Sequence, residues 1–196
     1  MKHQDQQTLR HPLVLIVFHL LFFTGLPGGA SLTLAELPPD LSTGIGVLAE
    51  YKSNAEQQAQ ILVGLAAVDD ITKDDYRKGQ SLYAQAKAGF DGWIDQLVFE
   101  IQSGTTEALS PNHEEIQEKA KAKGDAFTTY VQEQLGKGQR GEVGHTLKSV
   151  FASIKDAALS IATGFTKVPP AEQSAVIKKL EEYKWPEFHT IEERRQ

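Results

Sequence analysis

The chain has 196 residues, of which 40 % are hydrophobic and 23 % are charged, a composition typical of a globular domain with its own core. Its net charge of −6 argues against a nucleic-acid-binding surface, because phosphate groups are bound by clustered lysine and arginine side chains. The sequence contains no cysteine, which excludes disulfides, thiol catalysis and thiolate metal sites.

The first 30 residues have the pattern of a secretory signal peptide. Lys2 and Arg10 precede an apolar run at 13–23, and small residues follow up to Ala30. Cleavage is expected after Ala30, and Thr33 with Ala35 offers a second site five residues on. The apolar run is shorter than the roughly 20 residues that cross a bilayer, so an uncleaved N-terminal anchor is the less favoured alternative. This pattern predicts an exported protein, either periplasmic or secreted.

Residues 31–39 predict a short linker, because Pro38 and Pro39 do not fit inside a helix. Asp40 and Ser42 then supply side chains suited to cap a helix start. After these residues, apolar side chains recur at alternating spacings of three and four, which predicts a first helix of about 25 residues. Its predicted buried stripe consists of Leu41, Ile45, Leu48, Ala55, Ala59, Leu62 and Ala66.

The stretch 75–104 predicts the central packing helix of the fold. Asp91 and Asp95 flank Trp93 at four-residue spacing and are candidates for a general acid/base pair. Because that role needs burial to separate the two pKa values, a solvent-facing pair is the favoured interpretation. The apolar and small residues of the stretch form one helical stripe, namely Tyr76, Gly79, Tyr83, Ala86, Phe90, Trp93, Leu97 and Ile101.

The acidic turn before this helix can be interpreted as a calcium loop or as a helix start. It contains Asp69, Asp70, Asp74 and Asp75, but it lacks the glycine and the closing glutamate of an EF-hand loop. Acidic side chains that follow Thr72 favour a helix N-terminus. We therefore predict helix capping here and no metal site.

Two further helices are predicted, separated by a glycine-rich loop. Ser110 and Pro111 indicate the start of the third helix. The loop at 136–141 follows a helix and lacks the Gly-Lys-Ser/Thr ending of a P-loop, so a turn is favoured over a phosphate site. The fourth helix, 143–165, is the most apolar of the mature chain; a core-facing stripe is favoured, and membrane insertion is the alternative. The stripe of the third helix consists of Ile116, Ala120, Gly124, Phe127, Val131 and Leu135.

The C-terminal part combines a short charged helix, 171–183, with a cluster of aromatic residues around Pro186. Packing over the open end of the bundle is the favoured role of this cluster, and recognition of a partner is the alternative. Residues 191–196 are polar and are expected to fray. The residues that we name as a candidate interaction surface are Trp93, Trp185 and Phe188.

No catalytic motif is present in the sequence. It contains no GxSxG, P-loop, dinucleotide fingerprint or helical histidine pair at metal spacing. After the predicted signal peptide, His113, His145 and His189 each stand alone. We therefore expect no enzyme activity, no cofactor and no metal.

The sequence thus predicts an all-α protein: an antiparallel bundle of four long helices within residues 40–190, with a short C-terminal helix and an aromatic cap. Export, helical build and missing catalytic motifs together favour a non-enzymatic protein that binds an unknown protein partner or assembles with itself. One alternative is a membrane-active protein whose fourth helix inserts. The other is a bundle that holds a small ligand between helices near Trp93. Nucleic acid is not an expected partner, and membrane contact is expected only through the N-terminal segment or the fourth helix.

Overall fold

The structure is a computed structural model that describes residues 37–104, 109–137 and 154–190. All of these residues belong to one compact unit, Leu32–Gln196. The predicted signal peptide, most of the linker, residues 138–141 of the predicted glycine-rich loop, the first part of the fourth helix and the predicted frayed tail lie outside the described residues. The first two residues of that predicted loop, Gly136 and Lys137, are instead helical.

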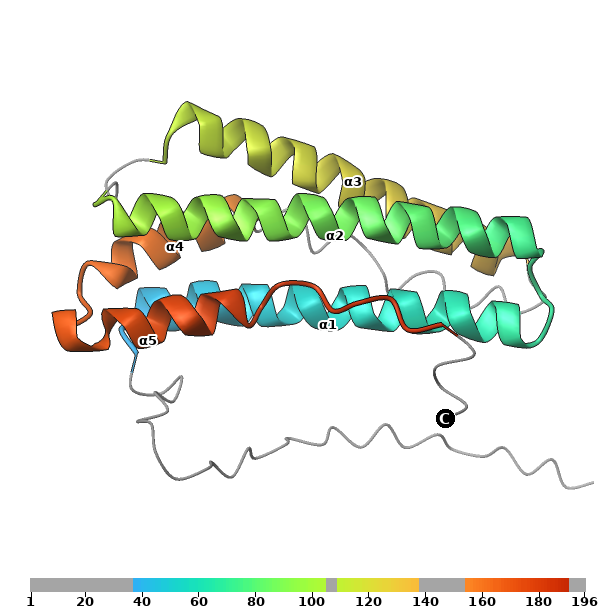
Figure 1. The fold of residues 1–196 in the computed structure, drawn as a ribbon, viewed down its shortest axis with the longest axis horizontal. Coiled ribbons are helices and arrows are strands. Elements are labelled where there is room, and N and C mark those ends of the chain that lie inside the picture. The colour runs from blue at the N-terminus through green and yellow to red at the C-terminus, as the bar shows by residue number, and fades with distance from the viewer. Residues whose placement is uncertain (1–36, 105–108, 138–153, 191–196) are drawn as a thin grey trace, which may run out of the picture. The chain divides into compact units, whose positions relative to one another are not determined.

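The described residues form an all-α bundle, which confirms the predicted fold class (Figure 1). No strand occurs among them. The two closely packed helix pairs are α2 with α3 and α1 with α4. None of the described helices combines the length and the apolarity that a membrane crossing needs. The helices are α1 (Pro39–Ala67), α2 (Lys73–Gln102), α3 (Pro111–Lys137), α4 (Ile154–Phe165) and α5 (Pro170–Glu181).

Helix starts follow the local sequence signals. Pro39, Pro111 and Pro170 each occupy the first position of a helix, where a missing N–H costs no helical hydrogen bond. At the start of α2, the Thr72 hydroxyl oxygen accepts the Asp75 N–H at 3.1 Å, and the Thr72 hydroxyl donates to the Asp75 carboxylate at 2.7 Å. The acidic turn therefore caps α2, and no group of three or more metal-ligating side chains occurs in the described part of the chain.

The pairing of α1 with α4 depends on two glycines. A Cβ atom at Gly164 would lie 2.4 Å from the backbone nitrogen of Leu41, and one at Gly44 would lie 2.5 Å from a side-chain carbon of Ile161. The two helices therefore approach more closely than larger residues at these positions would allow. An ion pair between Lys167 and Asp40 joins the ends of the pair at the surface.

The predicted stripe of α2 forms the centre of the core. Tyr83, Phe90 and Trp93 have 1 % or less of their surface exposed, and Leu97 is fully buried. Large apolar side chains at these positions remove the most surface from water and so contribute most of the packing free energy. α2 is therefore the helix on which α3, α5 and the C-terminal residues pack.

Candidate functional site

The three residues named as a candidate interaction surface lie in one continuous row of aromatic rings. The Phe90 ring centroid lies 5.4 Å from that of Trp93 and 5.5 Å from that of Trp185. Tyr83 continues the row, with its centroid 5.6 Å from Trp185 and 5.2 Å from Phe188. We call this set the aromatic row; its members are Tyr76, Tyr83, Phe90 and Trp93 of α2 together with Trp185 and Phe188.

Within this row the three named residues have little free surface. Trp93 is 0 % exposed, Trp185 is 4 % exposed and Phe188 is half-buried. In this conformation the rings therefore contact one another and not a partner. The favoured sequence interpretation placed the C-terminal aromatics over the open end of the bundle, but they lie along the side of α2, because α2 presents aromatic rings at every second turn.

Residues 182–190, which we call the C-terminal segment, follow α5 without helical structure beyond its last turn and run along the length of the bundle (Figure 1). They lie on the face that α1 and α2 form together. Lys52 of α1 donates to the Glu182 carbonyl at 3.0 Å, and the Tyr83 hydroxyl of α2 donates to the Pro186 carbonyl at 2.9 Å. We call this the α1–α2 face.

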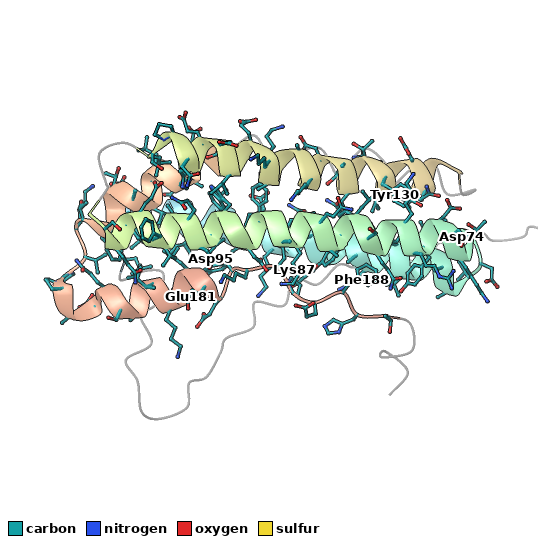
Figure 2. The ribbon with its side chains drawn as sticks, turned by 45° about the horizontal axis from the view of Figure 1, so that its top comes forward. Asp74, Lys87, Asp95, Tyr130, Glu181 and Phe188 are labelled. Atoms are coloured by element: carbon teal, nitrogen blue, oxygen red, sulfur yellow. The ribbon has the colours of Figure 1, made fainter. Side chains whose placement is uncertain are left out.

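A row of charged α2 side chains also contacts the C-terminal segment. The Asp95 carboxylate pairs with Lys184 at 2.5 Å, and the Asp91 carboxylate accepts the Trp185 N–H at 2.9 Å. Both Lys87 and Asp95 project from the edge of α2 that faces the segment (Figure 2). Asp91 and Asp95, considered as an acid/base pair from the sequence, thus both contact the C-terminal segment.

Lys87 links the two sides of this contact. Its ammonium group lies 2.7 Å from an oxygen of Asp91 and 3.3 Å from an oxygen of Glu187. Partial burial acts to lower the pKa of Lys87, but the hydrogen bonds and charges of the two carboxylates outweigh it and raise the pKa. Lys87 therefore remains a cation that bridges two anions, one from α2 and one from the segment.

Two cavities adjoin the C-terminal segment. The first, of about 260 Å³, is lined by α1, by Tyr83 and by segment residues that include Pro186 and His189. The second, of about 420 Å³, lies at the α1–α2 turn, where Tyr76, Arg77 and Thr190 are among its lining residues. The segment therefore leaves part of the α1–α2 face unfilled at this end of the bundle.

A second polar group lies buried where α2 ends and α3 begins, and the sequence interpretation did not anticipate it. The Trp93 indole N–H donates to His113 Nε2 at 2.9 Å, and His113 Nδ1 lies 3.6 Å from Glu100 Oε2. Glu100 is 2 % exposed and also accepts hydrogen bonds from Gln96 and from the Ser110 hydroxyl. We call Trp93, Glu100, Ser110 and His113 the buried polar cluster.

Burial and hydrogen bonding set the charges in this cluster. Burial lowers the pKa of His113, although Glu100 and Glu114 oppose the shift, so the imidazole is neutral at pH 7. Burial alone would raise the pKa of Glu100, but hydrogen bonds from Ser110 and Gln96 outweigh it and lower the pKa, so Glu100 is a carboxylate. The bond from Trp93 requires a free lone pair on Nε2, which places the imidazole proton on Nδ1, toward Glu100.

The buried polar cluster joins α2 to α3, and none of its side chains is positioned as an activated nucleophile. The Ser110 hydroxyl donates to Glu100 and accepts the His113 backbone N–H at 3.1 Å, so it caps α3. The imidazole Nε2, which would have to take a proton from a hydroxyl, is already bonded to Trp93. A sequence signal for the cluster did exist: Glu100 follows Trp93 by seven residues and therefore shares its buried helix face.

The fold and the site together define a helical bundle that holds an extended segment on one face. Comparison with protein-family models, with curated proteins and with solved structures finds no match for this chain. Of the histidines considered as lone catalytic candidates, His113 belongs to the buried polar cluster and His189 is exposed beside the smaller cavity. His145 lies outside the described residues.

Proposed function

We propose that this chain is a non-enzymatic, exported helical-bundle protein that acts by binding a protein segment, from a partner or from a second copy, on its α1–α2 face. The observation that carries the proposal is the C-terminal segment, which this face binds as an extended peptide. Export is inferred from the N-terminal sequence pattern.

The contacts on the α1–α2 face have the two parts that peptide recognition requires. Side chains of the bundle bind main-chain groups: Asp91 accepts an N–H, while Tyr83 and Lys52 donate to carbonyl groups. The rings of Trp185 and Phe188 pack against aromatic residues of α2. In peptide-binding proteins, main-chain hydrogen bonds supply affinity and side-chain pockets supply specificity.

The polar side chains of this face are suited to binding and not to catalysis. Asp91 and Asp95, the only carboxylate pair that the sequence interpretation considered for acid/base chemistry, are both engaged with the segment. Tyr83 donates to a carbonyl, and burial raises the pKa of its hydroxyl, so it remains protonated. These groups fix the position of a peptide.

A labelled peptide tests this function. The full chain with Phe188→Ala should hold its own segment more weakly, because the ring contacts to Tyr76 and Tyr83 are lost. We expect a fluorescent peptide of residues 182–190 to bind this variant saturably, as measured by fluorescence anisotropy. The unchanged chain should bind it more weakly, because its own segment competes for the same face.

The matched control is Leu159→Ala, which removes a large apolar side chain of α4 that is 45 % exposed and belongs to none of the ring contacts and hydrogen bonds described above for the segment. It should bind the peptide as the unchanged chain does, and a scrambled peptide should not bind to any of the three proteins. If Phe188→Ala retains its helical circular dichroism and still binds the peptide no better than the scrambled one, the proposed function is wrong.

A further inference from the structure

We propose that the C-terminal segment is exchanged between copies, so that residues 182–190 of one copy occupy the α1–α2 face of a second copy and form a reciprocal dimer. This inference rests on the proposed function and names the second copy as the protein bound. Every copy carries both the face and the segment that fits it, which is the requirement for a closed two-fold exchange.

The first support is that the anchoring contacts are independent of chain connectivity. The residues of α1 and α2 that bind main-chain groups of the segment lie 94 to 130 positions before it in sequence. Each of these contacts joins side chains of the bundle to the segment, so each forms equally well when the segment comes from another copy. Exchange therefore keeps the full set of contacts.

The second support is the connection between α5 and the segment. After α5 the chain makes one turn, in which the Tyr183 N–H bonds the Leu180 carbonyl at 3.1 Å and the Lys184 N–H bonds the Glu181 carbonyl at 3.3 Å. From Trp185 onward, the main chain meets side chains of α2. Opening this single turn frees the segment, while α5 keeps its own buried contacts through Val176 and Leu180.

The third support is that Pro186 prepares the segment for binding. Proline fixes its own φ angle and restricts the preceding residue, Trp185, to extended conformations. The free segment therefore loses less conformational entropy on binding than a flexible chain of the same length. A segment that is already extended can reach a second copy without first being reordered.

The fourth support is that the α1–α2 face matches this particular segment in order. Along α2, from its C-terminal half toward its start, Asp95 meets Lys184, Asp91 meets Trp185 and Lys87 meets Glu187. Tyr83 and Tyr76 then meet Phe188. Acidic residues of α2 thus face the basic residue of the segment, and the basic residue of α2 faces its acidic one. The ligand that complements this face in sequence order is the segment that each copy carries.

Concentration decides between the closed and the exchanged forms. Within one copy, a segment on a short connection has an effective concentration of about a millimolar. Since the contacts are the same in both forms, exchange becomes extensive when the protein concentration approaches that value. Confinement at a surface or in a small compartment has the same effect.

The ion pair between Lys184 and Asp95 allows exchange to be detected in the unchanged chain. A carbodiimide joins an amine directly to a carboxylate in contact with it, and both side chains are accessible, at 33 % and 60 % exposed. Isotope-labelled and unlabelled chains are unfolded together, refolded at increasing concentration and cross-linked. Mass spectrometry of the digest then shows whether the peptides that carry Lys184 and Asp95 came from one chain or from two.

We expect the share of mixed-isotope Lys184–Asp95 cross-links to rise with concentration toward one half, the value for complete random exchange. The matched control is the Lys121–Asp125 pair, which is joined at 2.7 Å within α3 and can form mixed cross-links only by random collision. Its mixed share should stay near zero at every concentration.

Exchange is overturned if Lys184–Asp95 cross-links form but remain within single chains, no more mixed than those of the control pair, up to millimolar concentration. That result does not decide the proposed function, because the peptide experiment measures binding to the α1–α2 face and does not require exchange. Absence of any Lys184–Asp95 cross-link would show that the segment does not dock on the α1–α2 face. It would overturn both the exchange and the proposed function.

Discussion

The two tryptophans of this chain lie one on each side of Phe90 in the aromatic row and are held in different ways. Trp93 belongs to α2 and donates its indole N–H to the buried His113 of α3. Trp185 belongs to the C-terminal segment, and its main-chain N–H bonds Asp91 at the edge of the bundle. Both side chains are almost fully buried, at 0 % and 4 % exposed. Burial alone therefore does not distinguish a contact that holds the core together from one that can separate while the core stays closed.

The two tryptophans differ in the element that carries the indole ring: α2 for Trp93 and the C-terminal segment for Trp185. Trp93 cannot leave its position without separating α2 from α3, one of the two closely packed helix pairs. Trp185 can leave when one turn after α5 opens. Substitutions on the Trp93 side should therefore act on global unfolding, whereas substitutions on the Trp185 side should act on release of the segment.

The largest expected effect is that of Trp93→Ala. Removing a fully buried indole from the core leaves a cavity and an imidazole without its donor, so we expect a loss of roughly 3–5 kcal/mol in the free energy of unfolding. Chemical denaturation followed by circular dichroism measures it. An unchanged denaturation midpoint would contradict the assignment of Trp93 to the core and would remove the contrast with Trp185.

The second prediction concerns pH and the buried polar cluster. Burial lowers the pKa of His113. As the pH falls through the ordinary histidine range, the unfolded chain therefore binds a proton at this residue that the folded chain does not bind, and the folded state loses stability. The pKa of Glu100 is also lowered, because its hydrogen bonds outweigh its burial, so its contribution is lost at still lower pH. Both lowered pKa values destabilise the folded state as the pH falls, so the free energy of unfolding should fall steadily from pH 7.5 toward pH 4.

Denaturation curves at several pH values measure this slope. His113→Gln keeps an acceptor for the Trp93 indole but carries no titrating group, so the part of the slope between pH 7.5 and pH 5.5 should become smaller. The matched control is His189→Gln, which makes the same substitution at an exposed histidine of the C-terminal segment, outside the buried polar cluster. Equal slopes in all three proteins would mean that His113 is not the group responsible.

The third prediction sets an upper limit on the stability lost through substitutions in the C-terminal segment. Trp185→Ala should cost about 1.5–3 kcal/mol, the transfer free energy of one buried aromatic side chain, and less than Trp93→Ala, because the segment can undock. Once it has undocked, further substitutions in it cost nothing more. The double variant Trp185→Ala/Phe188→Ala should therefore lose less than the sum of the two single losses. Additive losses would show that the segment does not dock and undock as one unit.

The fourth prediction separates the ring of Tyr83 from its hydroxyl. Tyr83→Phe keeps the aromatic row intact and removes only the hydrogen bond to the Pro186 carbonyl, so we expect a loss of about 1 kcal/mol. Because that bond belongs to the segment, amide hydrogen exchange in residues 182–190 should increase more than exchange in α2 or α3. Equal increases in amide exchange throughout the chain would instead show that the Tyr83 hydroxyl, like Trp93, stabilises the core as a whole.

The arrangement of the core was predictable from the sequence because it follows helical periodicity. The stripe that contains Tyr83, Phe90 and Trp93 repeats every three or four residues, and each of these side chains has 1 % or less of its surface exposed. Local signals also predicted where α2 starts, since Thr72 and Asp75 cap it reciprocally.

The candidate site was predictable only in part. The sequence drew attention to Trp93, Trp185 and Phe188, but it did not show that they form one row, because no period relates α2 to residues about 90 positions later. An extended segment has no internal pattern that fixes its place on a helix. Glu100 was missed for another reason: it is charged, and the helical period does not show that Ser110 and His113 satisfy it in three dimensions.

The smallest expected effect is that of Glu187→Gln, and it tests how the segment is held. The Glu187 side chain is 83 % exposed, so its pair with Lys87 should contribute no more than about 0.5 kcal/mol. Lys87→Met should cost more, because Lys87 is only 20 % exposed and also balances the charge of Asp91, which binds the Trp185 main chain. Denaturation midpoints of the two variants, compared at low and high salt, measure the difference. If Glu187→Gln proves as costly as Trp185→Ala, surface charge and not the aromatic row holds the segment to α2.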